Sequence, residues 1–469
     1  MKKLTEKNKS TEIEQLNFLD ESVNQEISEN FRPIHYLGSK LRMLNFIKDN
    51  IDKLDPTQGR VCDLFSGSGT VSRYLSKFRP VTSVDIQEYS RVICSALLNQ
   101  PEDSLLKVDE FIANCKKSKH YKDLIWALEP MIIYEEKCIQ MALNGQPKNI
   151  CELIENGSII RYEEGYLKEV SNELKECLEN TKNRLKKVNL YKSSKYQVVR
   201  YFGGIYFSYL QSIQMDVILE ELNNENSKLR DTLVAATLST ASEIVNTVGK
   251  QFAQPIKAFD KEGNPKKSIV NKVNKDRNEC VFDVFTIMVN KYLTQEKSKF
   301  KNVAYRMDYL EALDVIGNDV KVVYADPPYT RYHYSRYYHV LETICLRDNP
   351  NITKTTIKGI EDISRGIYRE DRHQSPFSIK TQASDAFDQL FCKVKEIGAD
   401  LVLSYSPFDE NKKEAPRLKS IEELENMARK YFKTVETVSI GEFYHSKLNR
   451  SDKNVDISYE AEILIICKQ

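Results

Sequence analysis

The hydrophobic positions near the start of the chain form short apolar runs separated by amphipathic stretches. Residues 60–65 and 81–85 are runs that end at an acidic residue or a glycine turn, which predicts two buried strands. Residues 71–77 and the stretch through Leu98 predict the helices that follow them. The order strand, helix, strand, helix at this spacing is typical of a parallel α/β sheet.

A different pattern begins at residue 101. Residues 101–190 are mostly helical in pattern, with Lys and Glu on the polar faces. Strand-like runs return only at 319–324, 400–404 and 461–466. The pattern therefore predicts the α/β fold class, with a sheet interrupted by a large, mostly helical insertion.

The chain divides into three predicted parts. Its 469 residues exceed one ordinary domain and favour a main domain with an insertion. Residues 1–30 are polar, with lysines first and acidic residues after them, and predict a flexible leader. We assign residues 31–100 and 301–469 to the sheet domain and residues 101–300 to the inserted domain.

Composition and charge narrow the function classes. The 69 basic and 68 acidic side chains leave a net charge of +1, which does not exclude nucleic acid, because binding follows local basic patches. The 10 cysteines form no Cys-x-x-Cys pair and there are 6 histidines, so we expect free thiols in a reducing cytoplasm and no metal. No apolar run of about twenty residues is present, so we expect no membrane span.

The turn after the first predicted strand carries the first chemical signal. Residues 63–70 join this strand to a helix through two glycines, which allow the backbone to approach a ligand closely. A Gly-x-Gly alone would be typical of a plain strand-to-helix turn. Two acidic residues at consecutive strand ends, Asp63 and Asp85, instead favour a ligand with a ribose. The loop lacks the third glycine of nicotinamide sites and the Gly-Lys-Ser or Gly-Lys-Thr of nucleoside triphosphate sites.

The loop resembles the cofactor loop of S-adenosylmethionine methyltransferases. In that family the first acid and the glycines surround the methionine part, and the second acid holds the ribose hydroxyls. Acidic residues suit a ligand that carries a sulfonium and an ammonium group. The resemblance implies a cofactor set of Asp63, Phe65, Ser66, Gly67, Gly69, Thr70, Asp85 and Ile86.

Residues 322–329 form the most informative stretch. A strand rich in Val and Tyr runs into Pro327 and Pro328, which cannot continue a ladder and therefore make a stiff turn. The adenine amine is a poor nucleophile, and the Asp326 carboxylate with the Pro327 carbonyl could accept its two hydrogens. Tyr329 could stack on a base that is flipped out of the duplex.

The segment Asp326-Pro327-Pro328-Tyr329 resembles the catalytic motif of amino-methyltransferases, and Asp in first place implies adenine. Residues 35–40 are similar to the opening element of Dam-like, class D12 adenine methyltransferases, with Tyr36 in place of Trp, and Lys40 carries over directly. Asp308-Tyr309 is similar to the family's Asp-Phe pair that contacts the adenine of the cofactor. The motif order is the alpha arrangement, which implies a Rossmann-like sheet and a target-recognition domain in the insertion.

Several segments are candidates for DNA contact. After the catalytic motif, aromatic residues interleave with arginines, and we single out Arg331, Tyr332 and Arg336. A helix whose tyrosines pack in the core explains the same pattern equally well. In the loop 257–277 we single out Lys266 and Lys267, although exposed lysines are usually only solvated. Residues 201–207 and 444–447 are weaker candidates, for which a structural role is the alternative.

These signals lead to one hypothesis with two alternatives. The leading hypothesis is a site-specific DNA adenine methyltransferase that uses S-adenosylmethionine, with double-stranded DNA as partner and, in a restriction-modification or phage-defence setting, a cognate restriction endonuclease. An RNA adenine methyltransferase would use the same active-site chemistry. A non-catalytic nucleic-acid-binding subunit with a methyltransferase fold is the third reading.

Overall fold

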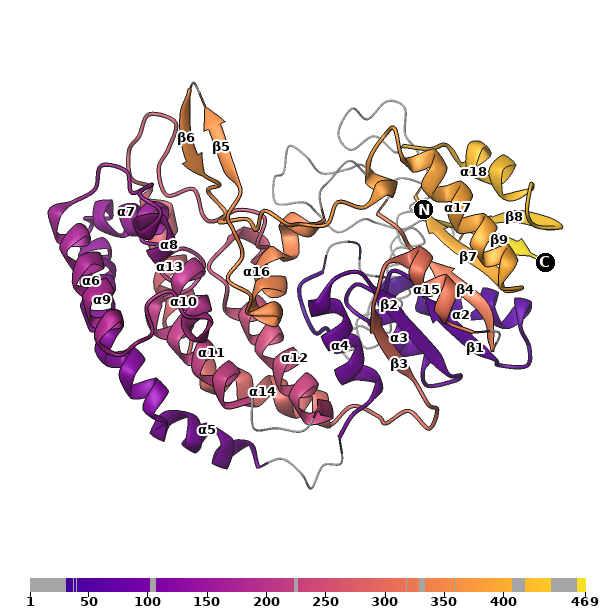
Figure 1. The fold of residues 1–469 in the computed structure, drawn as a ribbon, viewed down its shortest axis with the longest axis horizontal. Coiled ribbons are helices and arrows are strands. Elements are labelled where there is room, and N and C mark those ends of the chain that lie inside the picture. Colours follow the sequence, from indigo (N-terminus) through magenta and orange to yellow (C-terminus); the bar gives the residue numbers. More distant parts are fainter. Residues whose placement is uncertain are drawn as a thin grey trace, which may run out of the picture.

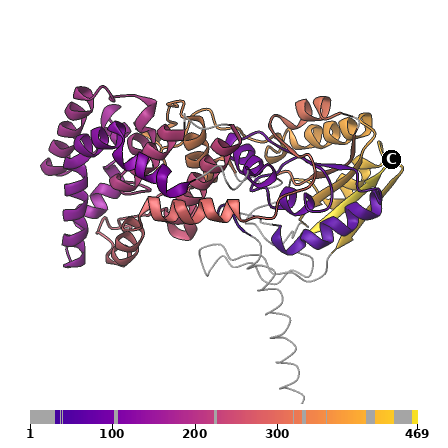
Figure 2. The same ribbon diagram turned by 90° about the horizontal axis from the view of Figure 1, so that it is seen from below.

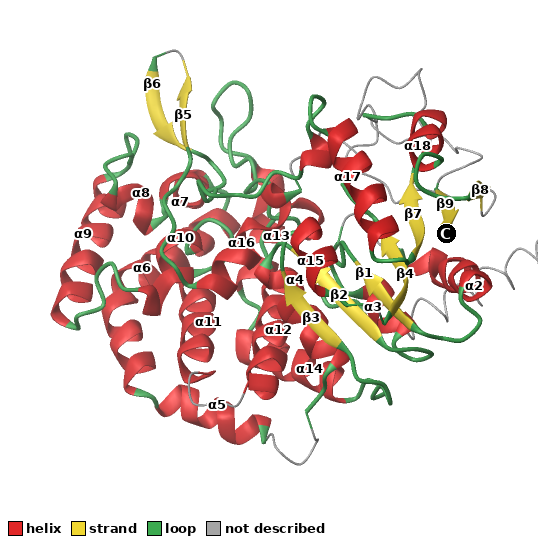
Figure 3. Ribbon diagram, turned by 45° about the vertical axis from the view of Figure 1, so that its right-hand side comes forward, coloured by secondary structure: helices red, strands yellow, loops and turns green. Residues whose placement is uncertain are grey.

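Two lobes lie side by side in the structure, which is a computed structural model (Figure 1). One lobe contains the main sheet and the other is mostly helical, as the colouring by secondary structure shows (Figure 3). The predicted leader, residues 1–30, lies outside the described residues. The structure describes residues 31–36, 38, 40–101, 107–222, 227–317, 319–328, 334–357, 359–406, 418–439 and 462–469.

The main sheet has seven strands in the order β3-β2-β1-β4-β7-β9-β8. The first five strands in this order are parallel, whereas β9 is antiparallel to both of its neighbours. A mixed α/β fold with a mostly parallel sheet is therefore confirmed, and it is consistent with a methyltransferase fold. The strands are β1 (Arg60–Asp63), β2 (Val81–Asp85), β3 (Val303–Arg306), β4 (Val320–Ala325), β7 (Asp400–Tyr405), β8 (Thr434–Ser439) and β9 (Ile463–Lys468).

Helices cover both faces of this sheet, because its central strands are apolar on both sides. On β4, Val323 faces one core and Val322 faces the other. The first core includes side chains of α15 (Tyr309–Val315), α17 (Ala383–Glu396) and α18 (Ile421–Ala428). The second includes side chains of α2 (Leu44–Leu54) and α3 (Thr70–Leu75).

The helical lobe is inserted in the chain between α4 (Glu88–Leu98), which follows β2, and β3. Its largest core cluster includes the apolar face of α4, so the insertion packs directly on the sheet lobe. Its helices are α5 (Val108–Lys117), α6 (Lys119–Leu143), α7 (Lys148–Asn156), α8 (Ile159–Glu163), α9 (Asn172–Lys187), α10 (Gln197–Phe202), α11 (Tyr209–Glu221), α12 (Ser227–Ile244), α13 (Val270–Arg277) and α14 (Val281–Leu293). None of the helices in the described ranges is long and apolar enough to cross a membrane.

The aromatic and glycine segment 201–207 is a packed turn. Its aromatic side chains are buried, and Tyr206 donates a hydrogen bond of 2.8 Å to the carbonyl oxygen of Phe252. The alternative that we gave for this segment, a structural role, is the one that the structure supports. The segment offers no surface for nucleic acid.

The helical lobe extends beyond residue 300. The sequence assigned residues 301–469 to the sheet domain, but α16 (Ser335–Leu346) and the strands β5 (Lys354–Ile357) and β6 (Ile360–Ile363) lie with the helical lobe (Figure 1, Figure 2). The reason is packing, since Val340, Leu341 and Ile344 of α16 join the core of that lobe. Residues 335–363 thus follow β4 in sequence but pack with the helical lobe and with α4.

Candidate active site

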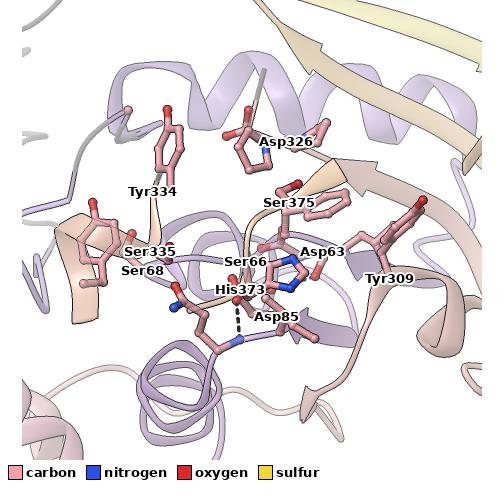
Figure 4. Close-up of a pocket in the computed structure, with 18 of the residues that line it drawn as sticks. Asp63, Ser66, Ser68, Asp85, Tyr309, Asp326, Tyr334, Ser335, His373 and Ser375 are labelled. Carbon is pink, nitrogen blue, oxygen red and sulfur yellow. Dashed lines mark hydrogen bonds between the residues drawn. The ribbon is translucent and has the colours of Figure 1, made fainter. Parts of the chain in front are cut away.

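A cavity opens at the carboxyl ends of β1, β2 and β4. In the sheet, β2 and β4 lie on opposite sides of β1, so the strand order reverses direction at β1. Open α/β sheets bind their ligands at the carboxyl ends of the strands where this reversal occurs. Figure 4 shows the side chains around this single cavity. The predicted residues that line it are Tyr36, Lys40, Asp63, Phe65, Ser66, Thr70, Asp85, Ile86, Asp308, Tyr309, Asp326, Pro327 and Pro328.

The remaining predicted residues lie elsewhere. Gly67 and Gly69 shape the loop between β1 and α3, and Arg336 follows the lining residue Ser335 on α16. Lys266 and Lys267 lie in the helical lobe just before α13, away from the cavity; Lys267 is exposed and Lys266 is half-buried. Outside the described residues lie Tyr329, Arg331, Tyr332 and residues 444–447.

Ser66 ties the loop after β1 to the end of β2. Its backbone N–H donates to the carbonyl oxygen of Val84 at 3.0 Å, and its hydroxyl donates to the carbonyl oxygen of Asp63 at 2.7 Å. The Ser83 hydroxyl donates to the Ser66 oxygen at 2.7 Å. These contacts hold the two acidic strand ends, Asp63 and Asp85, in a fixed relation.

Asp63 is the most buried acid of the cavity, with a relative exposure of 1%. The Ser72 hydroxyl, one turn into α3, donates to its Oδ2 at 2.6 Å. Burial nevertheless raises the pKa of Asp63 to about 7, and the nearby Asp326 adds to the rise. A carboxylate in this position would be stabilised by a cationic ligand.

Asp85 shapes the loop around it. The backbone N–H of Gly67 donates to its Oδ2 at 3.0 Å and that of Gln87 donates to its Oδ1 at 2.9 Å. Gly67 has a φ of +51°, and a Cβ there would collide with the phenol of Tyr36. Glycine is therefore required at this position, and each Asp85 oxygen keeps further acceptor capacity for a ligand.

Two groups of aromatic rings form walls of the cavity. Tyr36 stacks on Tyr338 at a centroid distance of 4.9 Å, and Tyr338 in turn stacks on Tyr89 at 5.3 Å. On the β3 side, the ring of Tyr309 lies 5.8 Å from that of Phe65. Flat apolar surfaces of this kind suit a purine ring.

Asp326 is held by a buried lysine. The Lys40 ammonium lies 3.1 Å from Asp326 Oδ2 and 2.7 Å from Glu462 Oε2, and it is 6% exposed. Burial raises the pKa of Asp326; Lys40 opposes the rise and Glu462 adds to it. One ammonium group thus serves two carboxylates, and Asp326 keeps negative charge despite its ion pair.

The sequence reasoning missed a second set of lining residues. Residues 373–378, which precede α17, line the cavity, and the Ser378 hydroxyl donates to the carbonyl oxygen of Pro328 at 3.4 Å. Burial lowers the pKa of His373, which also lies in this segment. No motif marks these residues; only the fold brings them to the cavity. Tyr89 and Glu462 were also missed. Tyr338 belongs to the aromatic run after the catalytic motif, and its ring packs in the core while it also lines the cavity, as the alternative for that run predicted.

The lining chemistry indicates the kind of ligand that would fit. Two acids, Asp63 and Asp85, lie at adjacent strand ends, and Tyr309 and Phe65 provide an aromatic surface. This set suits a cationic ligand with a ribose and a purine better than it suits a phosphate. Within the described ranges, no group of three or more His, Cys, Asp or Glu side chains could hold a metal ion.

A comparison with protein families finds a match for part of the chain. Residues 36–127 match the family described as D12 class N6 adenine-specific DNA methyltransferase. The matched stretch contains Tyr36, the Asp63 loop and Asp85, and it ends inside α6. The match confirms the resemblance that the sequence motifs predicted.

A curated protein is similar over most of the chain. The modification methylase LlaI of Lactococcus lactis subsp. lactis is 25% identical over 440 residues, which are 93% of this chain and 55% of that protein. The chain therefore spans about half the length of this relative. The similarity includes the region of Asp326, which the family match does not reach.

The buried position of Lys40 leads to a stability prediction. Replacing it with Met leaves Asp326 and Glu462 without their shared cation, so we expect a loss of about 3 kcal/mol in the free energy of unfolding at pH 8. At lower pH the loss should shrink, because protonation removes the unpaired charges. Thermal unfolding followed at two pH values measures both effects.

A matched control is available on the surface. Lys119 pairs with Asp123 but is 86% exposed, so Lys119→Met should change the stability by about 0.5 kcal/mol or less. An unfolding midpoint of Lys40→Met equal to that of the unchanged protein at pH 8 would contradict the prediction.

Proposed function

We propose that this protein is a site-specific DNA methyltransferase that transfers the methyl group of S-adenosylmethionine to the exocyclic amine (N6) of adenine. The observation that carries the proposal is that Asp326, at the end of β4, lines the same cavity as Asp63 and Asp85. An acceptor for an amine thus lies beside two acids suited to a cationic, ribose-bearing cofactor. The family match and the name of the relative support DNA as the substrate.

Different residues of the cavity would bind different parts of the cofactor. When bound, S-adenosylmethionine supplies an electrophilic methyl group. Asp63 would pair with its ammonium group, and Asp85 would accept hydrogen bonds from the ribose hydroxyls. The rings of Phe65 and Tyr309 would contact its adenine, while Tyr36 would close the opposite wall.

The target amine is then held at the end of β4. The Asp326 carboxylate and the Pro327 carbonyl oxygen would accept its two hydrogens and localise its lone pair on nitrogen. Lys40 fixes the Asp326 carboxylate, and the hydrogen bond from Ser378 to Pro328 fixes the turn. The proton that the amine loses would leave toward Asp326. The stacking role of Tyr329 remains a prediction.

The DNA would contact both lobes on the side of the molecule where the cavity opens. We propose the helical lobe as the target-recognition part, with residues 335–363 added to the predicted 101–300. The base would be flipped out to reach the cavity. Arg336 and the lysines Lys266 and Lys267 remain proposed DNA contacts, as do Arg331 and Tyr332. The word "modification" in the relative's name supports a restriction-modification setting. A phage-defence setting, a cognate endonuclease and a cytoplasmic location are further proposals.

The direct test is transfer of a labelled methyl group. We expect label in the N6 position of adenine when the protein is incubated with labelled S-adenosylmethionine and duplex DNA of diverse sequence. Mapping of the methylated sites then gives the recognition sequence. The same assay with RNA separates the RNA alternative. Label in RNA alone would overturn the proposal, as would binding of the cofactor without transfer to either nucleic acid.

Two variants separate catalysis from cofactor binding. Asp326→Ala should lower the rate of methyl transfer about 10³-fold, because the amine loses its acceptor, while the Kd for S-adenosylmethionine stays nearly unchanged. Asp85→Ala should raise that Kd about tenfold or more, because hydrogen bonds to a carboxylate are lost. Calorimetry and single-turnover assays measure the two quantities. Equal loss of cofactor binding in both variants would refute the division of roles.

The pH dependence of the rate reports on Glu462. Asp326 acts as a carboxylate, so the rate should fall as the pH falls through its raised pKa. Glu462→Gln removes a charge that raises this pKa, so the acidic limb of the rate profile should move to lower pH. Glu462→Asp keeps the charge and serves as the control. An unchanged limb in Glu462→Gln would show that Glu462 does not act on Asp326.

A further inference from the structure

The ring of Tyr368 holds two arginines that the proposed chemistry does not use. The guanidinium carbon of Arg336, on α16, lies 5.0 Å from the ring centroid, and that of Arg372 lies 4.8 Å from the same centroid. Arg336 also donates from Nη2 to the Tyr368 hydroxyl oxygen at 3.3 Å. Two cations from separate segments thus contact one aromatic ring.

The ring itself is fixed. Tyr368 is 7% exposed, and its hydroxyl donates to the carbonyl oxygen of Ala253. The ring of His339 contacts it edge-on at a centroid distance of 4.9 Å. The two guanidinium groups therefore rest on a rigid support and lose little freedom when they bind a ligand.

Neither arginine has an acidic partner among the described residues, although neighbouring arginines do. Arg365 pairs with Glu155 at 2.7 Å, and Arg369 pairs with Asp348 at 2.6 Å. In contrast, no carboxylate in the described part of the chain lies within ion-pair distance of Arg336 or Arg372. Nη1 of Arg372 is buried and has no hydrogen-bond acceptor there.

The charge of Arg372 is only partly compensated. Burial lowers the pKa of Arg372 and the positive charge of Arg336 lowers it further, while Tyr368 and the neighbouring Asp371 oppose the change. An anion bound by these guanidinium groups would offset their positive charge. Guanidinium groups bind phosphate oxygens through paired N–H groups, so phosphate is the anion that fits them best.

The pair lies beside the mouth of the candidate active site. Ser335 and His373, which are the chain neighbours of Arg336 and Arg372, both line the main cavity. An adjoining cavity that Arg372 lines shares Ser335 and His373 with it. A phosphate on the pair would therefore belong to a molecule whose other part reaches the cavity.

We propose that Arg336 and Arg372, supported by Tyr368, form a phosphate site that binds the DNA backbone next to the flipped adenine. This inference rests on the proposed function, since it places the substrate of that reaction. It adds Arg372 and Tyr368, which no motif identified. A backbone contact at this point holds the strand in position but reads no sequence.

The salt dependence of DNA binding tests the site. The protein is titrated with a fluorescein-labelled, mixed-sequence duplex at several salt concentrations, and anisotropy gives the Kd. Loss of one phosphate contact should lower the slope of log Kd against log salt concentration by about one. We expect this change for Arg372→Gln and for Arg336→Gln, with an approximately tenfold weaker Kd at low salt and an unchanged Kd for S-adenosylmethionine.

Two further variants control the experiment. Arg372→Lys keeps the charge but loses the paired N–H groups, so the salt slope should stay while the Kd rises. Arg429→Gln removes an arginine that directly follows α18 and pairs with Glu425, and it should leave both quantities unchanged. Because Arg372→Gln relieves repulsion from Arg336 but also loses the contact with the Tyr368 ring, the unfolding midpoint should change little.

The outcomes are distinct. An unchanged slope and Kd in Arg372→Gln overturns the phosphate site, even if methyl transfer to adenine is observed. A lower slope without any methyl transfer supports the site and refutes the proposed function instead. If Arg372→Gln weakens binding of inorganic phosphate but leaves DNA binding unaffected, the site takes another anion and the proposal fails.

Discussion

The contact on which the candidate site depends is the one between Lys40 and its two carboxylates. Lys40 precedes α2, Asp326 follows β4 and Glu462 precedes β9, so a single buried ammonium joins three distant segments of the chain. With Asp326 alone, the ion pair would be neutral and a poor acceptor for an amine that becomes positive. Glu462 draws on the same ammonium, so negative charge remains at the end of β4. The ion pairs of Lys40 with Asp326 and Glu462 thus stabilise the ends of these three segments and also set the basicity of Asp326.

Helix α16 lines one side of the cavity and connects the sheet lobe with the helical lobe. Tyr338 on this helix stacks between Tyr36 and Tyr89, and Glu342 accepts hydrogen bonds from the backbone N–H groups of Glu88 and Tyr89 at 3.1 and 3.0 Å. An acidic side chain from the helical lobe therefore caps the first turn of α4, directly after the Asp85 loop. A displacement of α16 relative to the sheet lobe would therefore change the aromatic wall of the cavity through these contacts.

The sequence predicts those site residues that have a reactive side chain and also stand next to a recognisable turn. Asp63, Asp85 and Asp326 each stand at a strand end, and their neighbours are glycines or prolines that mark the turn. Glu462 carries no such mark, because its partner Lys40 is 422 positions away and only packing brings them together. The position of α16 is hidden from the sequence for a related reason: α16 follows β4 in sequence, but its apolar face joins the core of the helical lobe.

The net charge of +1 conceals a separation of charge around the cavity. The strand ends carry Asp63, Asp85 and Asp326, whereas the rim next to Ser335 and His373 carries Arg336 and Arg372. A cationic ligand is favoured deep in the cavity and a polyanion at its edge, and neither preference appears in the sum over the chain. The acidic groups lie at the ends of the strands, whereas the two arginines lie on α16 and in the segment before α17. Because these are different elements, the acidic groups and the arginines can be altered separately. Under the proposed function, this arrangement would suit a reaction in which a positive cofactor and a negative polymer meet at one nitrogen atom.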